Sequence, residues 1–463
     1  MMVHKVKQLG IDFGSSKTCV VAFLEGKSQP VVICEPRTNC DYFLSYMSPT
    51  PDPDRYLYFQ GVLRGDGAPM TDLKENFSGK PEKVRLFFKE LRRVCEEGTL
   101  EKYDFSGLER IVFGYPAYQD PGASELYYRK MSALLAEVFE IDVKQIVGCP
   151  EPVLAASAHD HVCAVKSMEK GDVLLVFDLG GYTMDLAVLQ MDHGKRTTKV
   201  LQYIPSGSIG HHVSMGQYLT ARITQFVYGS PSVDCYDPRV EEQKRKLFSS
   251  DPEQQGEAHR RTARKYSPEQ YPGGKACFSL RYSEAEAADT GDDTVCVSMV
   301  EDAEIEDIYG DCGECVDAYL KNAPLAGKRV FVLFTGGTSN IKQFRATILN
   351  RLEQYHVQKV WVVDECTDKP FLDGKRTLSS VNAVALGAAL VACGRVECIT
   401  ERKMRAKPVK SESAAWNRQL QQTLNRSEAA KNGLISEIRS LIRQNPADLK
   451  EKLAALIKYF ENP

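Results

Sequence analysis

Residues 8–23 read QLGIDFGSSKTCVVAF, an apolar run in which an aspartate stands between two glycines. Val6–Phe13 and Cys19–Leu24 are rich in β-branched and apolar residues, and a Gly-Ser-Ser turn joins them. This pattern predicts a strand, a tight turn and a second strand. It is not a P-loop, because that motif needs four residues between its glycines, whereas three separate Gly10 from Gly14.

The turn has the chemistry of an anion site. Gly14, Ser15 and Ser16 offer backbone N–H groups and hydroxyls, which suit phosphate oxygens. Asp12 would repel a phosphate unless a cation lay between them, and hydrated Mg²⁺ is the ion that fits such a position. Taken alone, the stretch is equally compatible with an ordinary acidic hairpin.

Composition limits the classes of function. The 463 residues are enough for two or more packing units, and the net charge of −3 does not favour a nucleic acid or an anionic membrane as partner. We expect no membrane span and no signal peptide, because no apolar run is long enough. Fourteen scattered cysteines predict buried thiols and a cytoplasmic location. Cys312 and Cys315 lack the further ligands of a zinc site, so we interpret them as structural.

Strands alternate with helices along the chain, which predicts an α/β protein. Residues 35–75 are rich in Pro, Asp and Tyr and predict an irregular insertion, and 80–98 have the pattern of an amphipathic helix. Residues 229–275 are polar and rich in Pro and Gly, so we expect a surface excursion. Two further strand–turn signals follow the first, at 171–191 and 328–352.

The strand–turn segment at 171–191 has the same order of residue types as the first one. An apolar strand leads to Asp178, then to two glycines, and then to Thr183 and Asp185. Two such hairpins, one from each half of the chain, could close on one polyphosphate, with Asp12 and Asp178 sharing a hydrated Mg²⁺. The third signal adds a close backbone approach at a Gly-Gly pair.

In this order the segments resemble the ATPase superfamily of actin, hexokinase and the 70-kDa heat-shock proteins. Five segments carry the resemblance, in the order first phosphate motif, first connecting helix, second phosphate motif, adenosine motif and second connecting helix: IDFGSSKT (11–18), EPVLAASA (151–158), DLGGYTMD (178–185), TGGTSNI (335–341) and NAVALGAALVA (382–392). YPAYQD at 115–120 and the spacing of the motifs are most similar to the 70-kDa heat-shock chaperones. The resemblance covers about residues 5–396.

The resemblance implies a two-lobed actin-like ATPase fold, in which ribonuclease H-like lobes have mixed β-sheets flanked by helices. It implies the following boundaries: lobe I at 1–165, with an insertion at about 35–107 and completed by about 377–396; lobe II at 170–376, with a variable subdomain at about 206–297; and a helical C-terminal extension at 397–463.

It also implies roles for residues. Asp12 and Asp178 would hold Mg²⁺ through water, Asp185 would lie near the ion, and Glu151 would help order the catalytic water. The phosphate cradle would comprise Gly14, Ser15, Ser16, Gly180, Gly181 and Thr183. The ribose and adenine would contact Glu241, Lys244 and Arg245 in EEQKRKLF, and the nucleoside pocket would be closed by Gly336, Gly337 and Thr338. An ordinary solvated charged helix is the alternative interpretation of EEQKRKLF.

The resemblance also implies a lysine that faces the phosphates, but no clear motif in the sequence identifies it. Lys89 in LFFKEL is the candidate, with Lys83 behind it. Three departures from the family pattern weaken the expectation of hydrolysis: Tyr182 replaces a glycine, Asn340 an arginine and Val381 an acidic residue.

The end of the chain also departs from a standard chaperone of this family. LISEIRSLIRQ (434–444) and DLKEKLAALIKYF (448–460) predict short amphipathic helices, which either pack on the ATPase or bind a protein partner. This plan resembles the divergent type-twelve branch of the heat-shock family, which lacks the usual substrate-binding domain. We expect an ATP-dependent conformational switch with slow hydrolysis at most and a chaperone-related or adaptor role. The alternatives are a nucleotide-binding pseudo-ATPase scaffold and a small-molecule kinase.

Overall fold

The computed structural model describes most of residues 3–204, then 325–357, 359–363 and 378–396, and a few positions between these segments. Within 3–204 it leaves out 53–54, 65–69, 71–72, 75–76, 78, 99–100, 117–120, 164–168, 170, 182–183 and 193–196. The chain divides into two units, Met1–Thr400 and Glu401–Pro463, and all described residues lie in the first. The predicted C-terminal helices, the Cys312–Cys315 pair and most of the predicted excursion at 229–275 therefore lie outside the described residues.

The first sheet grows from the N-terminal hairpin. β1 (Val3–Phe13) and β2 (Lys17–Leu24) pair antiparallel, and β3 (Val31–Val32) pairs with β2. On its other side β1 pairs parallel with β8 (Arg110–Tyr115), which pairs with β9 (Ile146–Pro150). The strand order is β3-β2-β1-β8-β9.

The second sheet grows from the second predicted hairpin. β10 (Val173–Leu179) and β11 (Met184–Asp192) pair antiparallel, followed by β12 (Thr197–Ile204). On its other side β10 pairs parallel with β13 (Arg329–Thr335), which pairs with β14 (Lys359–Val363). Every residue of β10 is buried, as expected for a strand covered on both faces.

The two sheets share one plan. Each begins with a run of three antiparallel strands in chain order, and then adds two parallel strands beside the first of them. The order β12-β11-β10-β13-β14 is therefore the order of the first sheet repeated. The described part of the chain thus contains the same five-strand arrangement twice, built from residues 3–150 and again from 173–363.

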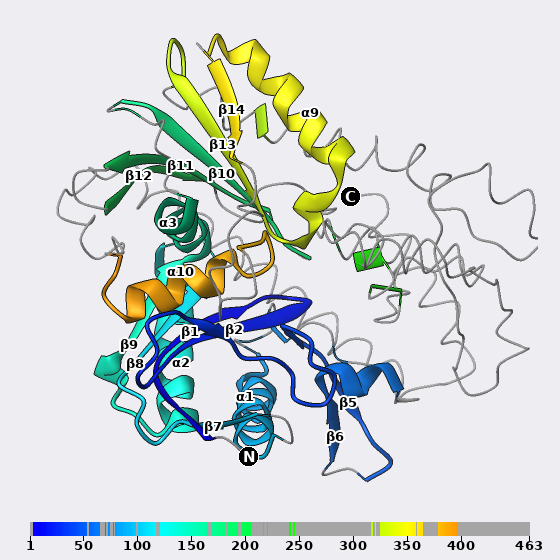
Figure 1. Cartoon of the computed structure of the whole chain (residues 1–463). Helices are drawn as coiled ribbons and strands as arrows, with labels where there is room; N and C mark the ends of the chain where they lie inside the picture. Colours follow the sequence, from blue (N-terminus) through cyan, green and yellow to red (C-terminus); the bar gives the residue numbers. More distant parts are fainter. Residues whose placement is uncertain are drawn as a thin grey trace, which may run out of the picture. The chain divides into compact units, whose positions relative to one another are not determined.

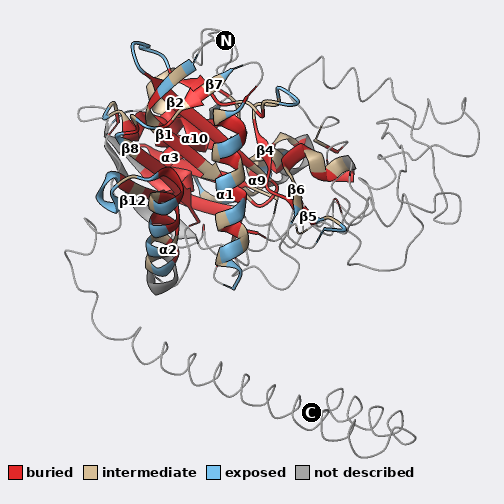
Figure 2. Ribbon diagram, turned by 90° about the horizontal axis from the view of Figure 1, so that it is seen from below, coloured by how far each residue is buried: buried red, intermediate tan, exposed pale blue. Residues whose placement is uncertain are grey.

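Helices pack on the first sheet and between the two sheets. α1 (Pro81–Glu96) and α2 (Pro121–Phe139) pack on the first sheet, while α3 (Glu151–Cys163) and α10 (Ala383–Ala392) lie between the two (Figure 1). The buried residues of α1 recur at helical spacing, and its other face is exposed (Figure 2). α10 is buried along its whole length, which requires its small apolar residues. A further helix, α9 (Lys342–Leu352), follows β13.

Close backbone approaches fix α10 in place. A Cβ at Gly387 would lie 1.9 Å from the carbonyl oxygen of Leu154 in α3, and a Cβ at Gly10 would lie 2.3 Å from the carbonyl oxygen of Ala385. Neither position therefore has room for a larger side chain. These contacts bring α10 directly beneath β1, the strand that leads to Asp12.

The predicted irregular insertion at 35–75 is more regular than expected. It contains β4 (Phe43–Leu44), β5 (Met47–Pro49), β6 (Tyr56–Tyr58) and a 3-10 helix (Phe59–Arg64). The Pro- and Asp-rich turns obscure these strands in the sequence. Phe59 is fully buried and meets both Phe43 and Phe87 with ring centroids 5.1 Å apart, so aromatic packing organises the segment.

β7 (Lys102–Asp104) pairs with β1 at the margin of the first sheet. None of the described helices combines the length and the apolar character that a bilayer span requires. Cys19, Cys95 and Cys149 are buried free thiols.

Candidate functional site

The two hairpins present their aspartates at the same register. In the first, Asp12 pairs with Cys19 and Phe13 with Thr18; in the second, Asp178 pairs with Asp185 and Leu179 with Met184. The first turn therefore comprises residues 14–17, and the second begins at Gly180; in both, an aspartate stands two positions before the first glycine of the turn. The second hairpin carries a carboxylate at Asp185 where the first carries a thiol.

The first turn is closed by its own backbone. The Gly14 N–H donates to the Lys17 carbonyl oxygen at 3.0 Å, and a Cβ on Gly14 would approach that oxygen to 2.6 Å. Ser15 and Ser16 are buried at 7% exposure each. Among the described residues, the Ser16 hydroxyl has no hydrogen-bond partner, which leaves a buried donor available to a bound group.

The turn at Gly336-Gly337, which follows β13, packs against the turn of the second hairpin. Gly336 has φ +80°, and a Cβ there would lie 2.3 Å from the Leu179 carbonyl oxygen and 2.8 Å from Asp178 Oδ1. Only glycine suits this conformation and this contact. The Thr338 hydroxyl donates to the Gly180 carbonyl oxygen at 2.8 Å, and the Gly336 N–H donates to the Ser380 carbonyl oxygen at 2.8 Å. These bonds join the end of β13 to the second hairpin and to the segment before α10.

A buried ion pair lies beside the aspartates. Lys74 Nζ donates to Glu151 Oε1 at 2.7 Å, and the two side chains are 8% and 6% exposed. Glu151 is the first residue of α3, directly after β9, so the strand and helix together fix its position.

A second buried cluster surrounds Lys244. Its ammonium lies 2.8 Å from Glu241 Oε2 and donates to the Gly216 carbonyl oxygen at 2.6 Å. Burial would raise the pKa of Glu241, but Lys244 and Thr220 lower it below its ordinary value. Beside the cluster, the Arg245 guanidinium carbon lies 3.9 Å from the ring centroid of Tyr42, in cation–π contact.

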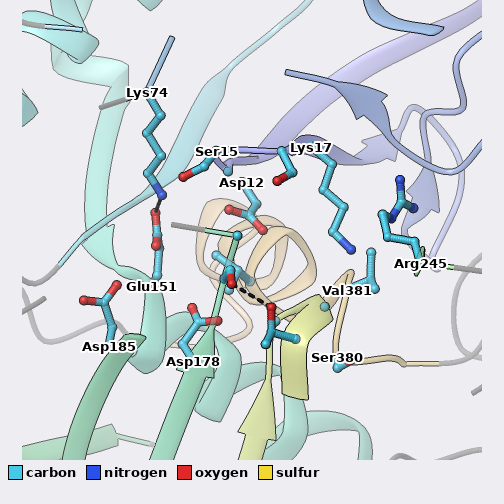
Figure 3. A pocket seen from close by; sticks show the side chains of 18 of the residues that line it. Asp12, Ser15, Lys17, Lys74, Glu151, Asp178, Asp185, Arg245, Ser380 and Val381 are labelled. Atoms are coloured by element: carbon cyan, nitrogen blue, oxygen red, sulfur yellow. Dashed lines mark hydrogen bonds and ion pairs between the residues drawn. The ribbon is translucent and has the colours of Figure 1, made fainter. Parts of the chain in front are cut away.

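The hairpin turns, the aspartates and the two lysine–glutamate pairs line one pocket (Figure 3). Its volume is about 860 Å³, including the space open to solvent. Fifteen of the predicted residues line it: Asp12, Gly14, Ser15, Ser16, Glu151, Asp178, Gly180, Gly181, Asp185, Glu241, Lys244, Arg245, Gly336, Gly337 and Thr338. Ile341, Val381 and Val384 add an apolar part to the lining.

Crowded carboxylates dominate the electrostatics of this pocket. Burial, followed by repulsion from Glu151, raises the pKa of Asp12 from its ordinary 3.8 to about 7. Burial and the charges of Glu151 and Asp185 likewise raise the pKa of Asp178 well above its ordinary value. The unliganded pocket therefore disfavours the full negative charge of its own carboxylates.

The lysines respond to the same surroundings in opposite ways. Burial alone would lower the pKa of Lys74, but the adjacent Glu151 carboxylate holds it well above the ordinary 10.5. For Lys17, burial and the nearby Arg245 charge lower the pKa to about 8. Lys74 is thus a paired cation, whereas Lys17 is a destabilised one.

The prediction for Lys89 is wrong. Lys89 lies on the outer face of α1, half exposed, 3.1 Å from Glu137 on the surface, and does not line the pocket. The reason is helical geometry, because its neighbours Phe87 and Phe88 point inward. Lys83 is also absent from the pocket lining and lies over the Tyr56 ring. The lysine beside Glu151 is Lys74.

The remaining predicted positions divide into two groups. Thr183 and Tyr182 lie outside the described residues. Asn340 accepts a hydrogen bond from the Ser380 hydroxyl at 3.1 Å and is absent from the pocket lining, whereas Val381 lines the pocket.

Sequence reasoning missed Lys17, Lys74 and Ser380. Lys17 was detectable in principle, since it ends the turn that carries Ser15 and Ser16. Lys74 and Ser380 come from stretches without strand or helix periodicity, and only the tertiary structure brings them to the pocket. No family model matches the chain.

Proposed function

We propose that the protein binds Mg·ATP between the two lobes of an actin-like ATPase fold and acts as a nucleotide-dependent conformational switch with slow hydrolysis at most. One observation carries the proposal. The same five-strand arrangement occurs twice, and each copy presents a hairpin turn and an aspartate at equivalent register to one pocket.

Hydrogen-bond donors in the two hairpin turns support the phosphate-binding part of the proposal. The first turn offers the backbone of Gly14 and the buried hydroxyls of Ser15 and Ser16, and the second offers Gly180 and Gly181. The free Ser16 donor is the kind of group that a phosphate oxygen satisfies. Turns from both sheets would thus hold one polyphosphate from two sides.

The fit to Mg²⁺ rests on the acidic oxygens. Asp12, Asp178 and Asp185 all line the pocket, and oxygen ligands are those that Mg²⁺ prefers. Among the described residues, no three His, Cys, Asp or Glu side chains are close enough to hold a metal ion by themselves. Asp12 and Asp178 would therefore act through water, with phosphate oxygens completing the shell, as is usual for Mg²⁺. When bound, the ion would neutralise charge on the phosphates.

Glu151 has a defined place in this scheme. It lies at the start of α3 beside the aspartates, and Lys74 holds its carboxylate at 2.7 Å. A carboxylate in that position would orient the attacking water. However, the charge of Lys74 is already balanced by Glu151, so less of it remains to stabilise a transferring phosphoryl group. This pairing supports slow hydrolysis and is also the observation that favours the alternative of a pseudo-ATPase scaffold.

The nucleoside would occupy the opposite end of the pocket. Gly336, Gly337 and Thr338 supply a glycine turn there, and Arg245 supplies a planar cation. Asn340 does not replace the arginine of the family pattern, because its side chain accepts a hydrogen bond from Ser380. The apolar side chains of Ile341 and Val384 would therefore supply part of the surface for the base.

The switch would follow from contacts to both lobes. Phosphates held by two turns stabilise a closed arrangement, and loss of the terminal phosphate removes part of that stabilisation. The C-terminal residues 397–463 would transmit the change to a protein partner or client in a chaperone-related or adaptor role, in the cytoplasm.

Calorimetric titration tests the proposal. Wild-type protein, Asp12→Asn and Asp178→Asn are titrated with ATP, ADP and a non-hydrolysable ATP analogue, with and without Mg²⁺. We expect Mg²⁺-dependent binding to wild type and at least tenfold weaker binding to each variant, with Asp104→Asn, outside the pocket, as control. Wild-type affinity in both pocket variants would contradict the shared-ion arrangement. A phosphate-release assay then separates a slow ATPase from a scaffold that binds without turnover.

A further inference from the structure

Lys17 occupies an unusual position in the pocket. It is the last residue of the first turn and the first residue of β2, so its backbone belongs to the first sheet. Its side chain reaches toward the second sheet, because a Cβ built on Gly337 would lie 3.3 Å from Lys17 Nζ. Figure 3 shows the ammonium pointing into the pocket near Arg245 and Val381.

The Lys17 ammonium has no hydrogen bond or ion pair with any residue that the structure describes, although Asp12 and Asp41 are near enough to influence it. The other cations of the pocket are engaged. Lys74 pairs with Glu151, Lys244 pairs with Glu241, and Arg245 lies over an aromatic ring. Lys17 is half-buried, so its charge is partly shielded from water and is available to an anion that enters the pocket.

The position of Lys17 in the pocket indicates which kind of anion it would bind. Asp12 lies between the two lysines: Lys74 and Glu151 are on one side, and Lys17 is on the other with Arg245 (Figure 3). In the arrangement proposed above, the first side faces the terminal phosphate and the second faces the nucleoside. Lys17 therefore stands where the inner phosphates of a nucleotide would pass.

We propose that Lys17 is a binding residue for the diphosphate part of the nucleotide, contributing equally to ADP and ATP; this rests on the proposed function. The ammonium carries its charge from the first sheet to the Gly337 turn of the second. An inner phosphate bound there would be held between the two sheets, whether or not a terminal phosphate is present. Lys17 would thus keep the product bound, while the groups around Glu151 distinguish ATP from ADP.

The experiment compares Lys17→Met with Lys17→Arg and with Lys89→Met, a matched lysine outside the pocket. ADP, ATP and inorganic pyrophosphate are titrated in the presence of Mg²⁺. A charge-assisted hydrogen bond predicts that Lys17→Met weakens ADP and ATP by similar factors, about 10- to 100-fold each. Lys17→Arg should stay within a few-fold of wild type, and Lys89→Met should not change.

A second readout excludes a merely structural role. Because Lys17→Met removes a half-buried charge that Arg245 repels, the nucleotide-free variant should melt at the same temperature as wild type or higher. Unchanged affinity for both nucleotides, or weakening for ATP alone, would overturn the inference while leaving ATP binding by wild type intact. Failure of wild type to bind any of the three probes would instead overturn the proposed function. If Lys17→Met does not fold, Lys17→Gln provides the same comparison.

Discussion

Asp12→Asn should stabilise the metal-free, nucleotide-free protein at pH 8, even though the same change should weaken nucleotide binding. Burial and the nearby Glu151 charge raise the pKa of Asp12 from 3.8 to about 7. Between these two pH values the folded state holds a proton that the unfolded chain releases. The free energy of unfolding therefore falls as pH rises through this window, and above pH 7 the whole cost of the charged carboxylate is present.

The size of the effect follows from the shift. About three pH units at 1.36 kcal/mol each give about 4 kcal/mol as the cost of ionised Asp12 at pH 8. An asparagine amide must also be desolvated, at about 1–3 kcal/mol. We therefore expect a net gain of about 1–3 kcal/mol at pH 8. It fades toward pH 4, because the folded wild type keeps its proton there and the unfolded carboxyl approaches its own pKa.

Urea unfolding in EDTA at pH 8, 6 and 4.5 measures this difference. The control is Asp104→Asn, which should have the opposite sign. The Asp104 carboxylate is exposed and accepts a hydrogen bond from the Ser106 N–H at 2.9 Å, so its pKa is lowered. That variant should lose a little stability at pH 8. An Asp12→Asn protein that is less stable than wild type at pH 8, or whose difference does not vary with pH, would refute the reasoning.

Three further outcomes are expected. Lys74→Met should cost about 3–5 kcal/mol by leaving Glu151 buried and unpaired, and adding Glu151→Gln should recover part of it in a double-mutant cycle of urea unfolding. Burial lowers the pKa of His159 from 6.5 to about 4. The folded protein therefore loses stability as pH falls from 6.5 to 4, because the unfolded chain takes up a proton that the folded state resists. His159→Leu should remove about 3 kcal/mol of this pH dependence of the unfolding free energy. Gly387→Ala should lower the melting temperature severely, because its Cβ would lie 1.9 Å from a carbonyl oxygen of α3, whereas Gly26→Ala, in open space at φ +76°, should cost only about 1 kcal/mol.

The hairpins could be predicted from sequence because their information is local. An apolar strand, an aspartate and a glycine turn stand within a dozen residues, and the turn chemistry fixes where each strand ends. Asp12 and Asp178 were therefore found in their correct structural places, at the ends of β1 and β10. The strand order was not accessible, because it depends on long-range pairing such as that between β10 and β13.

The lysines show where local reasoning fails. Lys89, the candidate in LFFKEL, has no clear motif, and the pattern of its helix turns it outward: the buried stripe of α1 passes through Phe87, Phe88 and Leu91. Lys74 lies in a stretch with no period, and its role follows only from the 2.7 Å contact with Glu151. Periodicity identifies which side chains enter a core, but it does not identify which charged side chain will meet another across a fold.

The charges of the pocket argue that its unliganded state is held under electrostatic strain. Asp12 and Asp178 resist ionisation together, and Lys17 resists protonation without a partner. A cation between the aspartates and an anion beside Lys17 would relieve both conditions at once, and neither ligand alone would do so. Mg²⁺ and a nucleotide should therefore bind with positive coupling, each raising the affinity for the other by the same factor. If the protein bound Mg²⁺ with the same affinity in the presence and absence of ADP, the cation and anion sites would be independent. The proposed coupling between them would then be wrong.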